Sequence, residues 1–132
     1  MKYQQPFFSE DVRSSIRQLE EAASQLIHEL NQYYKPVFKE KKLHFAAELF
    51  REGDDCFVPG YESALILEIS EEEELIGYHS TTLWECQRTW LGLPVTKDVP
   101  GSRIWGELAE ETMADIREEL EEYIEEQLEE VI

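Results

Sequence analysis

Cysteine is scarce in this chain, and so are long apolar runs. The 132 residues include two cysteines, Cys56 and Cys86, and neither has a partner in CxxC spacing. A disulfide framework is therefore not expected, and we interpret both as reduced core or surface thiols. The longest apolar run, residues 64–67, is far too short to span a bilayer, and residues 1–6 lack the apolar stretch of a signal peptide. We therefore expect a cytoplasmic protein.

Recognisable catalytic motifs are also missing. The chain contains no GxSxG, GxxxxGK[ST] or GxGxxG sequence, which argues against the common acyl-transfer and nucleotide-binding sites. The three histidines, His28, His44 and His79, fall on different predicted elements, and none has the close spacing of a metal site. The acidic run 71–74 lacks the alternating ligands and the turn glycine of an EF-hand loop. We therefore predict no catalytic residue, no bound metal and no cofactor.

Basic residues are few compared with acidic ones. Twelve Lys and Arg face thirty Asp and Glu, which gives a formal net charge of -18 at pH 7. Nucleic acids and anionic membranes are themselves negative and attract proteins mainly through Lys and Arg, so direct binding to either is disfavoured. We expect attraction to basic protein surfaces instead. Solubility alone is an equally weighted explanation of the imbalance.

The residues that are present favour one globular domain, 1–132. At 42% hydrophobic and 11% aromatic, the chain has enough apolar side chains to form a core. Ser9 is a good N-cap, and apolar residues then recur in steps of three and four, which predicts an amphipathic helix over 9–34. We place its end near Tyr34 because Pro36 disfavours helical geometry in the residue before it.

Residues 43–86 predict a β-meander of about three antiparallel strands. Apolar residues alternate in 43–49, and strand patterns resume in 63–70 and again in 75–79 after an acidic turn. With helices before and after it, this meander predicts an α+β fold in which long N-terminal and C-terminal amphipathic helices pack with a small antiparallel sheet.

The segment that follows is rich in aromatic residues. Residues 80–93 fit either a short capped helix or a strand that continues to about Cys86, and we prefer the strand. Trp, Tyr and Arg are frequent in the hot spots of protein interfaces. The candidate partner-binding side chains in this part of the chain are Tyr78, His79, Trp84, Arg88 and Trp90. The alternative is that the tryptophans cover the sheet as part of the core.

The end of the chain combines acidic residues with an apolar stripe. From residue 104 onward there are twelve acidic residues and one base, Arg117, while apolar side chains recur at helical spacing. This pattern predicts an acidic helix over 104–131. Eight pairs of acidic residues four positions apart should repel each other, so the helix needs its packed face, a partner or counterions. The stripe includes Val131, and Gln127 falls near its middle.

These features favour a protein-binding function. In size and charge the chain is similar to small acidic bacterial immunity proteins, and this resemblance implies no residue roles. We predict a non-catalytic inhibitor or immunity-type protein that neutralises a basic protein such as a nuclease toxin, in the manner of a nucleic-acid mimic. The acidic residues expected to attract that partner are Glu118, Glu122 and Glu126.

Two other classes of function remain open. Gln127 within the stripe would suit a pair of helices, so the protein could be a structural protein that forms a homodimer through its C-terminal helix. A metal-dependent hydrolase or nuclease would use His44, Glu68 and His79 as its ligands, because both histidines fall on predicted strands.

Overall fold

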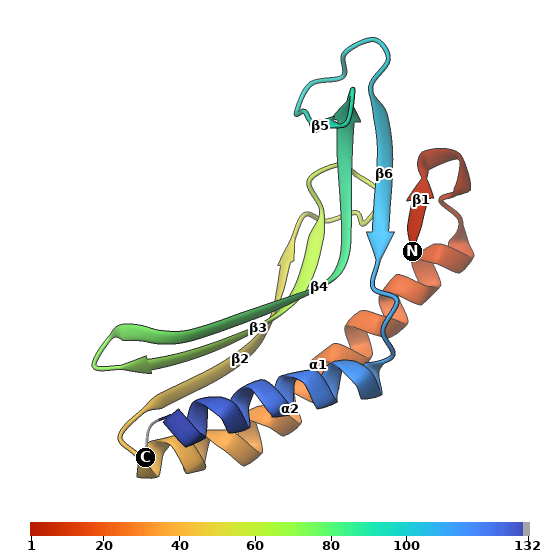
Figure 1. The fold of residues 1–132 in the computed structure, drawn as a ribbon. Coiled ribbons are helices and arrows are strands. Elements are labelled where there is room, and N and C mark those ends of the chain that lie inside the picture. Colours follow the sequence, from red (N-terminus) through yellow and green to blue (C-terminus); the bar gives the residue numbers. More distant parts are fainter. Residues whose placement is uncertain (131–132) are drawn as a thin grey trace. The chain divides into compact units, whose positions relative to one another are not determined.

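The computed structural model describes residues 1–130 and has an α+β fold (Figure 1). The elements in chain order are β1 (Lys2–Gln4), the 3-10 turn η1 (Gln5–Phe7), α1 (Glu10–Glu40), β2 (His44–Glu52), β3 (Glu62–Glu71), β4 (Glu74–Trp90), β5 (Leu93–Pro94), β6 (Arg103–Leu108) and α2 (Met113–Glu130). The six strands form one sheet in the order β1-β6-β4-β3-β2, with β5 paired to β4.

The α+β prediction is confirmed, but the sheet has six strands rather than about three. Val131, which we assigned to the apolar stripe, lies outside the described residues.

The chain divides into two compact units, each made from three segments. Unit 1 contains Met1–Glu20, Phe50–Ala64 and Thr82–Glu110, and unit 2 contains Glu21–Leu49, Leu65–Thr81 and Glu111–Ile132. Unit 1 has eleven acidic and seven basic residues, whereas unit 2 has nineteen acidic and five basic residues. Most of the negative charge therefore belongs to unit 2. The assignment of 1–132 to a single domain stays a prediction.

Both helices begin at side-chain caps. The backbone N–H of Val12 donates to Oγ of Ser9 at 3.3 Å, which confirms the predicted start of α1. At α2, Asp115 N–H donates to Oγ1 of Thr112 at 3.2 Å, and Thr112 N–H donates to Asp115 Oδ2 at 3.3 Å. This reciprocal pair is a capping box, and it fixes the first residue of α2 at Met113.

Helix α1 continues through Pro36 and ends at Glu40. A proline disfavours helical geometry in the residue before it, which is why we predicted an end near Tyr34. That prediction was wrong because the last turn has a strong tertiary contact. Phe38 is fully buried and stacks on Phe45 of β2, with ring centroids 5.2 Å apart. This packing outweighs the local effect of the proline.

Strand β4 settles the two interpretations of residues 80–93. It extends from Glu74 to Trp90, so the strand interpretation is confirmed and the strand passes beyond Cys86. A two-residue turn, Leu91-Gly92, then leads into β5, and both turn residues have positive φ angles of 51° and 80°. Such a pair is typical of the tight hairpin turns that suit twisted strands.

The start of the predicted acidic helix is instead a strand. Residues 103–108 form β6, which pairs antiparallel with β1 on one side and with β4 on the other. The predicted range 104–131 was therefore wrong at its beginning. Trp105 Nε1 donates to Oγ1 of Thr89 on β4 at 2.6 Å, which adds a side-chain bond to the strand pairing. Strand partners far away in sequence outweigh the helical spacing of these residues.

Each unit has its own buried residues. In unit 1 the core cluster consists of Val12, Ile16, Cys56, Tyr61, Trp84 and Cys86. In unit 2 the predicted inner residues of the central strands, Leu65, Leu67 and Ile69, are at most 1% exposed, which confirms the alternating pattern. No helix within residues 1–130 has the length and apolar character needed to cross a bilayer.

Candidate functional site

The apolar side of α2 is covered within unit 2. Three of its side chains are fully buried: Ile116, Leu120 and Ile124. Figure 1 shows α2 beside the later turns of α1, and polar contacts join the two helices. Arg117 forms an ion pair with Glu29, and the Tyr34 hydroxyl donates to Glu125 Oε1 at 3.1 Å. The packed face that the acidic helix needs is therefore supplied by the same unit.

The other side of α2 presents a row of acidic side chains. Among its 18 residues are nine acidic residues and one base, Arg117. Four of the acidic residues have a polar partner in the unit: Asp115, Glu119, Glu121 and Glu125. The three predicted attractors, Glu118, Glu122 and Glu126, are exposed, and none has an ion-pair partner among the described residues of unit 2. They follow one another at four-residue intervals and so lie along one line of the helix.

Repulsion between carboxylates of α2 extends to Glu111, which lies two positions before the helix. The pKa of Glu111 is raised above its ordinary value, chiefly by the negative charge of Glu119 and further by burial and by Asp115. A raised carboxyl pKa means that the folded chain disfavours the charged form. The negative charge on α2 therefore acts on a nearby carboxyl group, as expected, although the two predicted pairs that include Glu111 are not within the helix, because α2 begins at Met113.

Gln127 packs inside unit 2. A methyl group added at Gly77 of β4 would lie 3.1 Å from Gln127 Oε1 and 3.1 Å from the Tyr123 hydroxyl oxygen, so both side chains cover this glycine. The part of the stripe around Gln127, which we proposed for homodimer formation, thus packs on β4 within the same unit.

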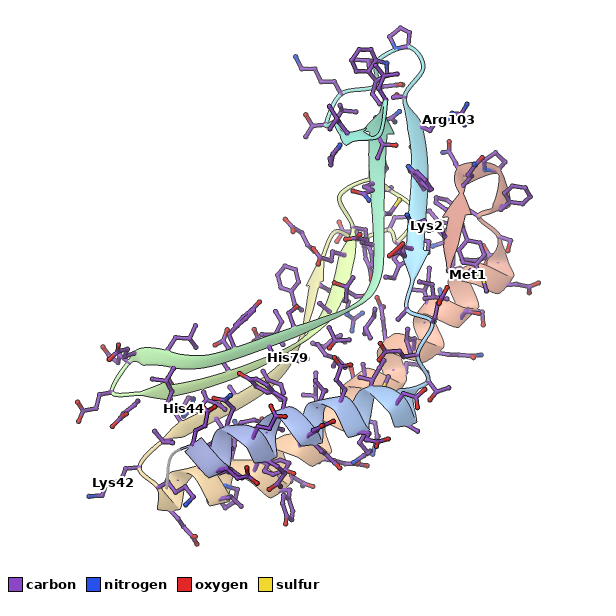
Figure 2. The ribbon with its side chains drawn as sticks, viewed as in Figure 1. Met1, Lys2, Lys42, His44, His79 and Arg103 are labelled. Atoms are coloured by element: carbon purple, nitrogen blue, oxygen red, sulfur yellow. The ribbon has the colours of Figure 1, made fainter. Side chains whose placement is uncertain are left out.

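Two candidate partner-binding residues, Tyr78 and His79, are neighbours on β4 in unit 2. Tyr78 is exposed, whereas His79 is in contact with α2. Figure 2 shows His79 on the strand. Its ring stacks on Tyr123 with centroids 4.8 Å apart, and its Nε2 lies 3.5 Å from Glu119 Oε1. Tyr78 is 52% exposed. Tyr78 is thus available to a partner, whereas His79 mainly fixes the position of α2.

Trp84 is a core residue of unit 1. It is fully buried, and its Nε1 donates to the Cys56 carbonyl oxygen at 2.7 Å. Aromatic rings surround it, namely those of Tyr3, Phe8 and Phe57. This is the alternative that we gave for the tryptophans, and we therefore remove Trp84 from the candidate partner-binding residues.

Arg88 holds a loop in place. Its Nη1 donates to Asp98 Oδ1 and to Ser102 Oγ, both at 3.0 Å, and only 17% of its side chain is exposed. These bonds tie the loop between β5 and β6 to β4. Arg88 therefore has less freedom to bind a partner than its sequence context suggested.

The hairpin between β4 and β5 has an apolar tip that the sequence analysis missed. Trp90 is 42% exposed, as predicted for a binding residue, and its neighbours Leu91 and Leu93 are 82% and 65% exposed. The available signal was Gly92 flanked by two leucines, because a turn glycine is normally flanked by polar residues. Trp90, Leu91 and Leu93 lie in unit 1, so the predicted hot spot is divided between the two units.

The alternative metal site lacks a suitable arrangement. The three proposed ligands fall on neighbouring strands of the sheet, His44 on β2, Glu68 on β3 and His79 on β4. Within residues 1–130, no three His, Cys, Asp or Glu side chains come together as a metal site.

Both cysteines are free and buried, and burial raises the pKa of Cys56 and raises that of Cys86 to about 12. Both thiols are thus held in the neutral form.

No family model, no curated protein and no solved structure matches this chain.

Proposed function

We propose that the protein is a non-catalytic inhibitor of the immunity type, which binds a basic protein through the acidic face of α2. The observation that carries the proposal is the row Glu118, Glu122 and Glu126, exposed and without ion-pair partners in unit 2, on a helix that is held by three fully buried apolar side chains. A rigid helix that keeps its carboxylates free presents the same charge pattern to every approaching molecule. Such a surface accelerates association with a partner of opposite charge.

The charge density of α2 favours a partner that normally binds nucleic acid. Its 18 residues span about 27 Å at the rise of an α-helix. Nine acidic residues and one base over that length leave one net negative charge per roughly 3.4 Å, which is the axial spacing of phosphates along one strand of B-DNA. A nuclease with a groove for a phosphate backbone therefore suits this helix, so the proposal includes nucleic-acid mimicry.

Further contacts would come from exposed aromatic residues. Tyr78 in unit 2 and Trp90 in unit 1 are the candidate residues with large exposed aromatic surfaces, and such side chains often supply binding energy once charge has guided the encounter. We also propose that the protein acts in the cytoplasm, in keeping with two free buried thiols.

The test compares two variants that remove the same number of charges from unit 2. One is Glu118→Gln with Glu122→Gln and Glu126→Gln on α2. The matched control is Glu71→Gln with Glu72→Gln and Glu74→Gln at the β3–β4 turn, where all three residues are also exposed. Each protein is immobilised and exposed to lysate of the native host at low and high salt, and bound proteins are identified by mass spectrometry.

The proposal predicts a basic partner that high salt releases. Its association rate with the α2 variant should fall on the order of tenfold at low salt, while the control variant keeps the parent rate. If the partner is a nuclease, its activity should be inhibited by the parent protein and recovered with the α2 variant. Equal slowing by both variants would show that net charge alone attracts the partner and would refute a defined binding face.

A further inference from the structure

A cavity in unit 1 gathers half of the arginines of the chain. It has a volume of about 180 Å³ and lies between the first turns of α1 and the segment that begins at the end of β2. The chain has six arginines, and three of them line this cavity: Arg13, Arg17 and Arg51. Two acidic residues, Glu20 and Asp54, also line the cavity, so an anion site there depends on the arginines that lack a close ion pair.

Arg13 is fully engaged within unit 1. It forms ion pairs with Asp55 at 3.3 Å and Glu10 at 3.4 Å, and its guanidinium lies 4.5 Å from the ring centroid of Phe57. These contacts fix the side chain at the wall of the cavity, and the two carboxylates offset its charge.

Arg17 and Arg51 are less engaged. The nearest acidic partner of Arg51 is Glu20, at a long 3.8 Å, and Arg17 has no ion pair among the described residues of unit 1. Arg17 also follows Arg13 at the four-residue spacing, at which like charges on a helix repel. Each guanidinium carries five N–H donors, so both arginines retain donors for another acceptor.

Two of the residues that line the cavity are buried and hydrogen-bonded to each other. Glu20 and Tyr61 are 7% and 6% exposed, and the Tyr61 hydroxyl donates to Glu20 Oε2 at 2.6 Å. Burial and the Glu20 carboxylate raise the pKa of Tyr61, so the hydroxyl keeps its proton. The other oxygen of this carboxylate, Oε1, lies 3.8 Å from Nη1 of Arg51.

We propose that this cavity binds one oxyanion group of a small molecule, with Arg17 and Arg51 as the donors. The planar guanidinium fork of each arginine matches the oxygens of a phosphate or a carboxylate. The volume of about 180 Å³ is below the roughly 300 Å³ at which pockets for whole small molecules begin, so the cavity suits a single oxyanion group rather than a whole nucleotide. This site lies in unit 1 and goes beyond the inhibitor function, which rests on unit 2.

The test is titration of the full chain with inorganic phosphate and, separately, with acetate, at constant ionic strength. Binding is followed by calorimetry and by amide chemical shifts. The variants are Arg17→Gln and Arg51→Gln, and the matched control is Arg103→Gln, an exposed arginine of β6 in the same unit that does not line the cavity (Figure 2). Arg51→Gln removes the ion-pair partner of the buried Glu20 and could therefore affect stability. Arg17 is exposed and has no ion pair in its unit, so Arg17→Gln should leave the fold intact and keeps the test valid.

Phosphate should shift amides in residues 13–20 and 51–61 and saturate in the millimolar range. Arg17→Gln and Arg51→Gln should each weaken binding on the order of tenfold, the loss expected for one charged donor group, whereas Arg103→Gln should bind like the parent. Tighter binding of phosphate than of acetate would indicate a phosphorylated ligand, and the reverse order a carboxylated one. No saturable shift with either anion, or equal binding by Arg17→Gln and the parent, would overturn the site.

Discussion

Gly106 of β6 is the residue whose replacement should disturb unit 1 most. A methyl group built at this position would overlap ring atoms Cζ2 and Cη2 of Trp84, and that indole is fully buried. Gly106→Ala should therefore destabilise the protein by about 1–3 kcal/mol, the range found for overpacked cores. The free energy of unfolding in urea measures the effect.

Gly77→Ala is the comparison for that experiment. Its nearest neighbours include the ends of the Gln127 and Tyr123 side chains, at 3.1 Å, and these can move. The loss should be below about 1 kcal/mol, since alanine also reduces the entropy of the unfolded chain. Equal losses for the two variants would contradict the role given to the Trp84 contact.

The turn between β3 and β4 contains a second residue-scale feature. Glu72 and Glu73 have positive φ angles of 48° and 72°, a region that costs residues other than glycine about 1 kcal/mol or more each. Glu73→Gly should raise stability by about 0.5–1 kcal/mol, measured as a higher urea midpoint. Glu73→Gln is the control, because it removes the same charge but keeps a side chain at the positive φ angle. If the urea midpoint of Glu73→Gln were as high as that of Glu73→Gly, the gain in stability would come from the lost charge and not from relief of backbone strain.

At the scale of elements, sequence reasoning succeeded where the signal was local. The Ser9 cap marked the start of α1, and alternation marked the buried face of β3, because both patterns depend on residues within a few positions. Sequence reasoning failed where residues far away in the sequence determine the local structure. The stacking of Phe38 on Phe45 carries α1 past Pro36, and pairing with β1 and β4 turns residues 103–108 into a strand.

The same limit applies to the candidate site. The acidic row was predictable because Glu118, Glu122 and Glu126 are related by helical spacing alone. Trp84 and Trp90 have similar sequence contexts, yet one is fully buried and the other is 42% exposed. The difference depends on which residues cover each ring, and for Trp84 these include Phe8 and Phe57 from other parts of the chain.

The α2 helix should become more stable when its free carboxylates are neutralised without any partner present. Glu118→Gln with Glu122→Gln and Glu126→Gln removes acidic pairs at the four-residue spacing, each worth roughly 0.2–0.5 kcal/mol. We expect a gain of about 1 kcal/mol at low salt that vanishes near 1 M salt, where the Debye length is about 3 Å. Thermal unfolding at both salt concentrations measures this. An unchanged melting temperature at low salt would show that the acidic row carries no strain.

At the scale of the whole molecule, carboxyl groups divide into two sets with opposite effects on stability. Burial first, and then Glu62 and Glu107, raise the pKa of Glu85, while Glu119 raises that of Glu111. In contrast, the hydrogen bond from Arg117 lowers the pKa of Glu29, and the backbone hydrogen bond from Phe57 lowers that of Asp55. When ionised, Glu85 and Glu111 destabilise the folded state, whereas ionised Glu29 and Asp55 stabilise it.

These directions predict a stability maximum on the acidic side of neutrality. As pH falls from 7, groups with a raised pKa take up protons in the folded state first, so stability rises. Below the ordinary values of 4.5 for Glu29 and 3.8 for Asp55, the folded chain must protonate groups that it stabilises as anions, so stability falls. We expect the highest melting temperature near about pH 5 at constant ionic strength. Glu111→Gln should reduce the rise and Glu29→Gln should reduce the fall, whereas a steady decrease from neutral pH downward would contradict the balance between the two sets.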